Sequence, residues 1–114
     1  SSLWTAAHYS IPVLFVISNN RSNFNDEIHQ ETVAITRNRP VENRWIGQRI
    51  DDPTVSIEKY AASLGVESAG PIEKVSDLVP ALEKALSVVE SGKPYLLNVH
   101  VEKGYAVPPP AREA

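Results

Sequence analysis

The sequence predicts an α/β fold in which helices flank a parallel sheet. Residues 13–18 form an uncharged apolar run that is rich in β-branched and aromatic residues, and residues 94–101 form a second apolar run. Such runs are typical of strands covered on both faces, as in a parallel sheet under helices. Segments with helical spacing alternate with them, and this alternation favours right-handed parallel crossovers in a layered sheet.

The first half of the chain is expected to form helix, strand, loop and helix, followed by a long polar loop. The predicted bounds of these segments are 2–10, 13–18, 19–23, 24–38 and 39–54. Ser2 could cap the first helix, and Trp4 is expected in the core. Pro12 prevents the first helix from continuing.

The second half is expected to form helix, short strand, helix and strand, ending in an extended proline-rich arm. The predicted bounds of these segments are 54–65, 66–70, 76–92, 94–101 and 108–114. In the first of these helices Gly65 is the terminator. The apolar face of that helix consists of Ile57, Tyr60, Ala61 and Leu64.

The helix over 76–92 is expected to begin with Ser76 as its N-cap and Asp77 in its first turn. Pro80 would then fall in the first turn, where no intrahelical donor is needed. The stripe that this pattern predicts to be buried consists of Leu78, Leu82, Leu86 and Val89.

Composition excludes several classes of function. The chain has 114 residues, about one domain, and its net charge of −3 does not favour nucleic acid. It has no cysteine, which excludes disulfides and thiolate metal sites and fits a reducing cytoplasmic setting. No apolar run reaches the ~20 residues that span a bilayer. The sequence opens without methionine inside an amphipathic segment, so we expect a longer polypeptide.

Two asparagines, Asn19 and Asn20, follow the first predicted strand directly. In open parallel sheets, ligands bind outside the carboxyl ends of the strands. An asparagine amide and a backbone carbonyl two residues later form a plausible half of a Mg²⁺ site, which a carboxylate from another segment would complete. The alternative is that both amides only hold a turn.

Residues 1–24, SSLWTAAHYSIPVLFVISNNRSNF, resemble the second half of the thiamine-diphosphate motif of the decarboxylase and carboligase superfamily. This superfamily includes benzoylformate decarboxylase and acetolactate synthase. Its motif opens with Gly-Asp-Gly and ends with Asn-Asn after a hydrophobic strand. Residues 55–66 and 78–110 resemble the helices, last strand and tail that follow. The resemblance implies that residues 1–114 are the C-terminal part of a three-layer cofactor domain, without its first strand and Gly-Asp-Gly turn.

The resemblance also implies site residues. The Asn20 side chain and the Ser22 backbone carbonyl would bind Mg²⁺. This ion would clamp the diphosphate of thiamine diphosphate. Asn19 would hold the turn, and Asn23 and Phe24 would face the cofactor. No catalytic residue is assigned, because the activating glutamate of this superfamily belongs to another domain. Ser22→Ala is expected to have little effect, since Ser22 would contribute a main-chain oxygen.

The implied activity is decarboxylation or ligation of a 2-oxo acid. It would require the remainder of the enzyme and a second subunit, in a homodimer or homotetramer without nucleic acid or membrane partners. Three alternatives remain: an acyl-CoA lyase of the oxalyl-CoA decarboxylase type, a non-catalytic α/β partner-binding module, and a small subunit that completes its site with another chain.

Several charged residues near the asparagines allow two interpretations. His29, with Asp26 and Glu27, could shuttle a proton; we favour the alternative, in which the acids suit a helix N-terminus and His29 is solvated. The arginines could contact an anionic substrate, although a solvated or subunit surface is favoured. These arginines are Arg37, Arg39, Arg44 and Arg49. Trp45 could anchor the loop on another domain, and His100 is expected to be paired or at an edge.

Overall fold

A computed structural model describes residues 2–102, with Phe24 described by its backbone alone. The predicted arm over 108–114 lies outside these residues. The chain divides into two compact units, which we describe separately. Of the described residues, the sheet unit comprises 2–19 and 54–101, and the helix–loop unit comprises 20–53 and Glu102.

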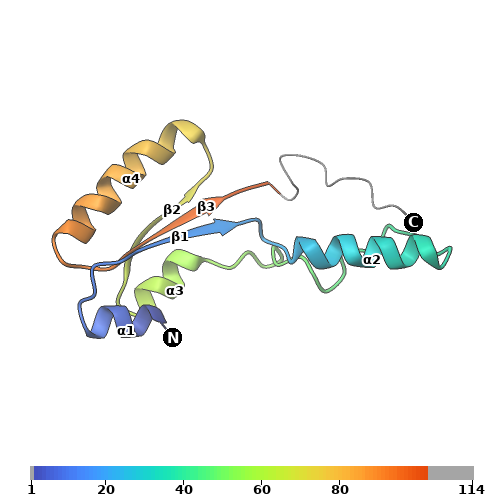
Figure 1. Ribbon diagram of the computed structural model, residues 1–114, viewed down its shortest axis with the longest axis horizontal. Helices are drawn as coiled ribbons and strands as arrows, with labels where there is room; N and C mark the ends of the chain where they lie inside the picture. The colour runs from blue at the N-terminus through green and yellow to red at the C-terminus, as the bar shows by residue number, and fades with distance from the viewer. Residues whose placement is uncertain (1, 103–114) are drawn as a thin grey trace. The chain divides into compact units, whose positions relative to one another are not determined.

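The sheet unit contains a three-stranded parallel sheet in the order β1-β3-β2 (Figure 1). The strands are β1 (Leu14–Asn19), β2 (Glu67–Ile72) and β3 (Tyr95–His100). Asn19 is the register partner of His100, so β1 and β3 end at the same level. The parallel sheet confirms the predicted fold class.

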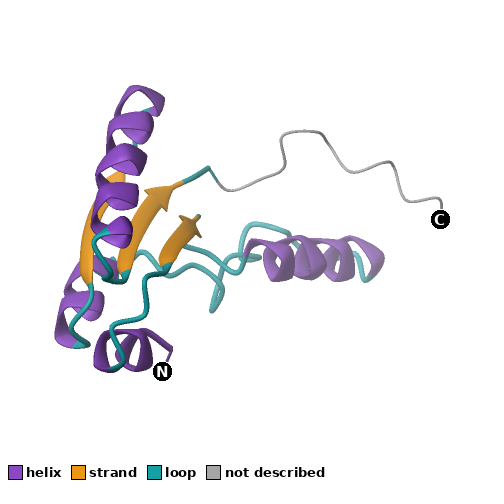
Figure 2. Cartoon of the chain, turned by 60° about the vertical axis from the view of Figure 1, so that its left-hand side comes forward, coloured by secondary structure: helices purple, strands orange, loops and turns teal. Residues whose placement is uncertain are grey.

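Helices cover both faces of this sheet, as Figure 2 shows. They are α1 (Ser2–His8), α3 (Ile57–Ser63) and α4 (Val75–Glu90). On one face α1 and α3 enclose a cluster made of Leu3, Ala61, Val66 and Leu96. On the other face α4 packs over a cluster made of Ala85, Tyr95 and Leu97. The flanking helices and the sheet therefore form three layers.

The two apolar strands differ in how completely they are covered. Residues Tyr95 to Asn98 of β3 are all buried, as the sequence predicted. The prediction is wrong for β1, where Val16 is 51% exposed. Within the described sheet β1 lies at an edge, and α4 packs mainly over β3, so only Leu14 of β1 contacts the cluster under α4.

Three predictions about the short helices are wrong in detail. Ser2 is the first helical residue rather than the cap. Trp4 is 52% exposed and stacks on His8, with ring centroids 4.8 Å apart, instead of entering the core. Tyr60 is 51% exposed, whereas Ala61 beside it is fully buried. Aromatic rings can lie flat along a helix surface, so spacing alone does not place them in the core.

Helix α4 begins earlier than predicted. Lys74 is its N-cap, and Ser76 lies inside the helix. Pro80 is therefore the sixth helical residue. Because proline has no backbone N–H, the Ser76 carbonyl lacks the donor that residue 80 would otherwise provide. Leu86 is 50% exposed, and Ala85 is buried instead. An α-helix turns by about 100° per residue. Viewed down α4, the residues that pack against the cluster lie within about 60° of Ala85, whereas Leu86 lies about 100° away. The packed residues are Ala81, Leu82, Val88 and Val89.

The helix–loop unit consists of α2 (Phe24–Thr36) and a series of turns that continues to Pro53. Both the helix and the long loop were predicted. None of the helices within residues 2–102 is long and apolar enough to cross a membrane.

Candidate functional site

The chain turns sharply immediately after β1. Asn19 ends the strand, and Arg21 has a positive φ of 57°. The Asn20 side chain folds back over the turn, so that its Oδ1 accepts a hydrogen bond of 3.0 Å from the Ser22 N–H. This is an Asx turn, and it places the Asn20 amide oxygen beside the main chain of Ser22.

The residues after this turn pair with the far end of the long loop. Ser22 lies opposite Arg49 in an antiparallel bridge. Asn23 N–H donates to Gln48 O at 2.8 Å, and Ile50 N–H donates to Arg21 O at 2.7 Å. These bonds make Ser22 and Arg49 a non-hydrogen-bonded pair, whose own N–H and C=O groups point outward. The Ser22 carbonyl is therefore directed to the side from which the Asn20 amide approaches.

A buried carboxylate lies behind the turn. Glu27, in the first turn of α2, is 1% exposed. Its Oε2 accepts from Ser22 Oγ at 2.8 Å, and its Oε1 accepts from Arg49 Nε at 2.9 Å. Arg49 also lies over the Trp45 ring, 5.7 Å from the centroid, at cation–π distance. Both carboxylate oxygens are thus paired, as a buried charge requires. We call Ser22, Glu27 and Arg49 the Glu27 triad.

The structure brings two of the four predicted site residues together. Asn20 and Ser22 are both half-buried and in direct contact. Asn23 is exposed at the N-cap position of α2, and its side chain makes no capping hydrogen bond. Phe24 begins α2, but its side chain is outside the described atoms. A role for Asn23 and Phe24 toward the cofactor stays a prediction.

The donors at this turn suit a hard cation. The Asn20 amide oxygen keeps a second lone pair besides the one that faces Ser22 N–H, and the Ser22 carbonyl is a second neutral oxygen. Mg²⁺ prefers such oxygens. Across residues 2–102 no cluster of three or more histidine or acidic side chains could hold a metal. The turn therefore fits part of a Mg²⁺ site that a carboxylate from elsewhere would complete.

The burial and the two hydrogen bonds of Glu27 were not predicted from the sequence, where Glu27 was expected to be a favourable acid at a helix N-terminus. Its partner Arg49 lies 22 residues away along an irregular loop, and no spacing rule predicts such a contact. The expected neutrality of Ser22→Ala also needs revision. The Ser22 hydroxyl is the donor to a buried carboxylate, so its removal leaves one Glu27 oxygen without that bond.

The other charged candidates have simpler surroundings. His29 is exposed, as favoured, and lines an open groove of about 430 Å³ together with Arg39 and Arg44. Arg44 lies 3.6 Å from Glu31, and both side chains are about 40% exposed. His100 pairs with Glu73, as expected, at 3.2 Å between Nδ1 and Oε1.

A family model matches residues 1–99, and its description reads thiamine pyrophosphate enzyme, C-terminal TPP binding domain. The matched range contains β1, β2, β3 up to its last residue but one, and the whole Asn20–Asn23 turn. No curated protein and no solved structure matches the chain.

Proposed function

Because the chain belongs to the family of the thiamine pyrophosphate enzyme C-terminal TPP-binding domain, we propose that its Asn20–Asn23 turn binds the cofactor diphosphate through Mg²⁺. Asn20 Oδ1 and the Ser22 backbone carbonyl would be two ligands of the ion. The observation that supports this proposal is the 3.0 Å hydrogen bond from Ser22 N–H to Asn20 Oδ1. The bridge to Arg49 directs the Ser22 carbonyl to the same side as its N–H, so both oxygens lie on one side of the turn.

The residues of this turn have a binding and orienting role in the proposal. The Asn20 amide would hold the ion, whose positive charge would offset that of the diphosphate. Asn23 and Phe24, at the start of α2, would face the cofactor. Thiamine diphosphate, when bound, would supply a nucleophilic carbon for addition to a carbonyl group and a cationic thiazolium ring as an electron sink.

We assign the reaction to 2-oxo acid decarboxylation or to carboligation of the acetolactate synthase kind. Residues 1–114 would be the C-terminal part of the cofactor domain of a cytoplasmic enzyme. The rest of that enzyme, in a homodimer or homotetramer, would supply the missing carboxylate ligand and the catalytic groups.

The second candidate reaction is that of an acyl-CoA lyase of the oxalyl-CoA decarboxylase type. The arginines that line the groove beside α2, Arg39 and Arg44, favour it because guanidinium groups bind nucleotide phosphates. The two candidate reactions are distinguished by measuring whether the complete enzyme turns over 2-oxo acids or acyl-CoA esters.

Calorimetry of the complete polypeptide with thiamine diphosphate and Mg²⁺ tests the binding proposal. Asn20→Ala is expected to weaken binding by about 10–100-fold, the usual effect of losing a group that supports a metal. Asn43→Ala, an exposed asparagine in the same helix–loop unit, is the matched control and should bind as the wild type does. Equal affinity of the Asn20→Ala protein and the control would contradict the proposal.

A further inference from the structure

Glu27 is unlike every other described side chain in the helix–loop unit. Among residues 20–53, apart from the undescribed side chain of Phe24, it alone is buried. Burial of a carboxylate is costly unless each oxygen is hydrogen-bonded, and removal of one partner leaves an uncompensated charge. The position of Glu27 therefore depends on both contacts that it makes.

These contacts form a closed ring around Ser22. The Ser22 hydroxyl donates to Glu27, and Glu27 accepts from Arg49. Arg49 is in turn the bridge partner of Ser22. Ser22 is thus held through its side chain and through the main-chain bonds of its neighbours, Arg21 and Asn23.

A ring of this kind determines the direction of a carbonyl. Hydrogen bonds to an ionised group are shorter and stronger than bonds between neutral groups. Glu27 holds the Ser22 hydroxyl, and the bridge to Arg49 holds the main chain on either side of Ser22. The peptide plane of Ser22 therefore has little freedom to rotate. Mg²⁺ demands near-ideal octahedral geometry, so the direction of each ligand oxygen affects its affinity.

We propose that Glu27 is a positioning residue, which acts through Ser22 and Arg49 to aim the Ser22 main-chain carbonyl at Mg²⁺. Glu27 itself touches neither the ion nor the cofactor. This inference rests on the proposed function of the turn. It assigns to the loop of residues 39–53 a specific task, the delivery of Arg49 to the carboxylate.

The test measures Mg²⁺ and Ca²⁺ affinities of the complete polypeptide at saturating thiamine diphosphate, by calorimetry. Glu27→Gln removes the charge, and Ser22→Ala removes the hydroxyl while leaving the main-chain carbonyl in place. Each is expected to weaken Mg²⁺ binding by about 10–100-fold. Because Ca²⁺ tolerates irregular coordination, its affinity should fall much less, and the Mg²⁺/Ca²⁺ ratio should drop about tenfold.

Two controls accompany these variants. Glu31→Gln changes the same residue type on the same helix, but this glutamate is 40% exposed and 3.6 Å from its arginine, so the ratio should stay as in the wild type. Ser22→Thr keeps the hydroxyl and should retain Mg²⁺ affinity within about threefold, as removal of the donor is what weakens the site.

The outcomes separate this inference from the proposed function. If Asn20→Ala loses Mg²⁺ affinity while Glu27→Gln and Ser22→Ala keep the wild-type ratio, the inference is overturned and the function stands. If the wild type shows no Mg²⁺-dependent binding, both are overturned. If the Glu27→Gln protein does not fold, Ser22→Ala decides the test. A Mg²⁺/Ca²⁺ affinity ratio equal to that of the wild type would then overturn the inference, and a lowered ratio would support it.

Discussion

The two units of this chain differ in the side chains that they bury most fully. In the sheet unit the largest fully buried side chains include Leu96 and Leu97, at 1% and 0% exposure. In the described part of the helix–loop unit the buried side chain is a carboxylate, Glu27. Apolar burial stabilises roughly in proportion to area and has no preferred direction. Charged hydrogen bonds contribute less area but specify orientation.

This difference suits the task of each unit. A sheet needs stable packing, and several combinations of apolar residues can provide it. A turn that presents two oxygens to a cation needs fixed directions, which the Glu27 triad supplies at Ser22. The comparison indicates that substitutions in the sheet unit affect stability, whereas substitutions in the triad affect the geometry of the site.

The largest expected effect is the loss of stability on Leu97→Ala in β3. Leu97 is fully buried under α4, so truncation removes apolar burial and leaves a cavity. We expect the free energy of unfolding to fall by about 2–5 kcal/mol, measured by urea denaturation. Leu86→Ala makes the same change at a half-exposed position on α4 and should cost much less. Equal costs would show that β3 is not the centre of the core.

A double-mutant cycle on the two ion pairs of α2 should give a smaller effect. Glu27 and Arg49 are 2.9 Å apart with the carboxylate buried, whereas Glu31 and Arg44 are 3.6 Å apart and half-exposed. We expect a coupling energy of about 1–2 kcal/mol for the first pair and under about 0.5 kcal/mol for the second. Unfolding free energies of the single and double alanine variants provide both values. Similar coupling in both pairs would remove the distinction drawn between the Glu27 triad and a surface pair.

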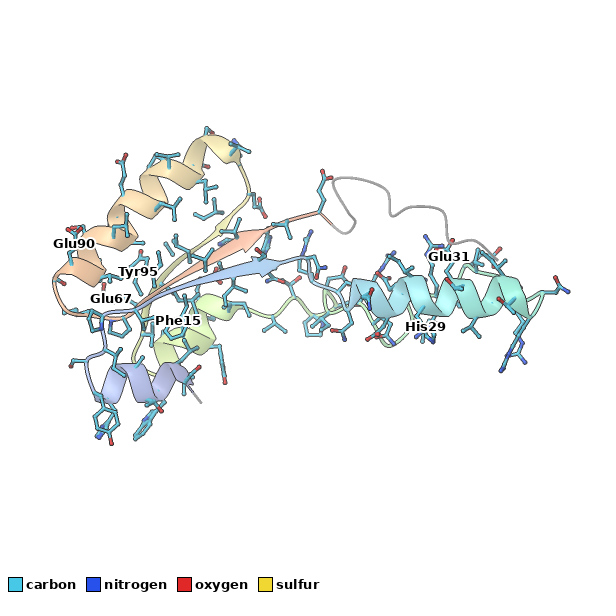
Figure 3. All side chains as sticks on the ribbon, in the orientation of Figure 1. Phe15, His29, Glu31, Glu67, Glu90 and Tyr95 are labelled. Carbon is cyan, nitrogen blue, oxygen red and sulfur yellow. The ribbon has the colours of Figure 1, made fainter. Side chains whose placement is uncertain are left out.

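The smallest expected effect concerns pH and Tyr95, which lies beside Glu67 where β2 and β3 begin (Figure 3). Burial, and then the nearby Glu67 carboxylate, raise the pKa of the Tyr95 hydroxyl above its ordinary value. The folded state therefore keeps this proton after the unfolded chain has lost it. Stability should be unaffected below pH ~10 and fall as the pH rises from there toward the raised pKa.

Tyr95→Phe checks this pH dependence, because it removes the ionisable group and leaves the ring in the apolar cluster. Unfolding free energies from about pH 9 to 11 should decline less steeply for this variant than for the wild type. The half-exposed Tyr60, changed to phenylalanine, is the matched control. A decline that Tyr95→Phe leaves unchanged would show that other groups cause it.

Much of the sheet unit could be predicted from local sequence. The apolar run at Tyr95–Asn98 predicted a strand covered on both faces, and the run before Asn19 predicted a strand that ends in amides. Periodicity predicted the buried face of each helix less well, because Leu86 and Tyr60 fit an apolar spacing and are nevertheless half-exposed. Spacing defines a face of a helix, but how much of that face is covered depends on the neighbouring elements.

The sequence by itself determined the parallel α/β class, through the alternation of apolar runs and helical segments along the chain. It also determined the turn after β1, because the amides follow the strand directly, whereas the family resemblance implied that Asn20 and Ser22 share a site. Only the tertiary structure decided that Glu27 is buried and bonded to both Ser22 and Arg49. Such a contact joins a helix to a distant irregular loop, whose path follows from packing rather than from any local pattern. The support of the proposed metal turn is therefore a property of the folded chain.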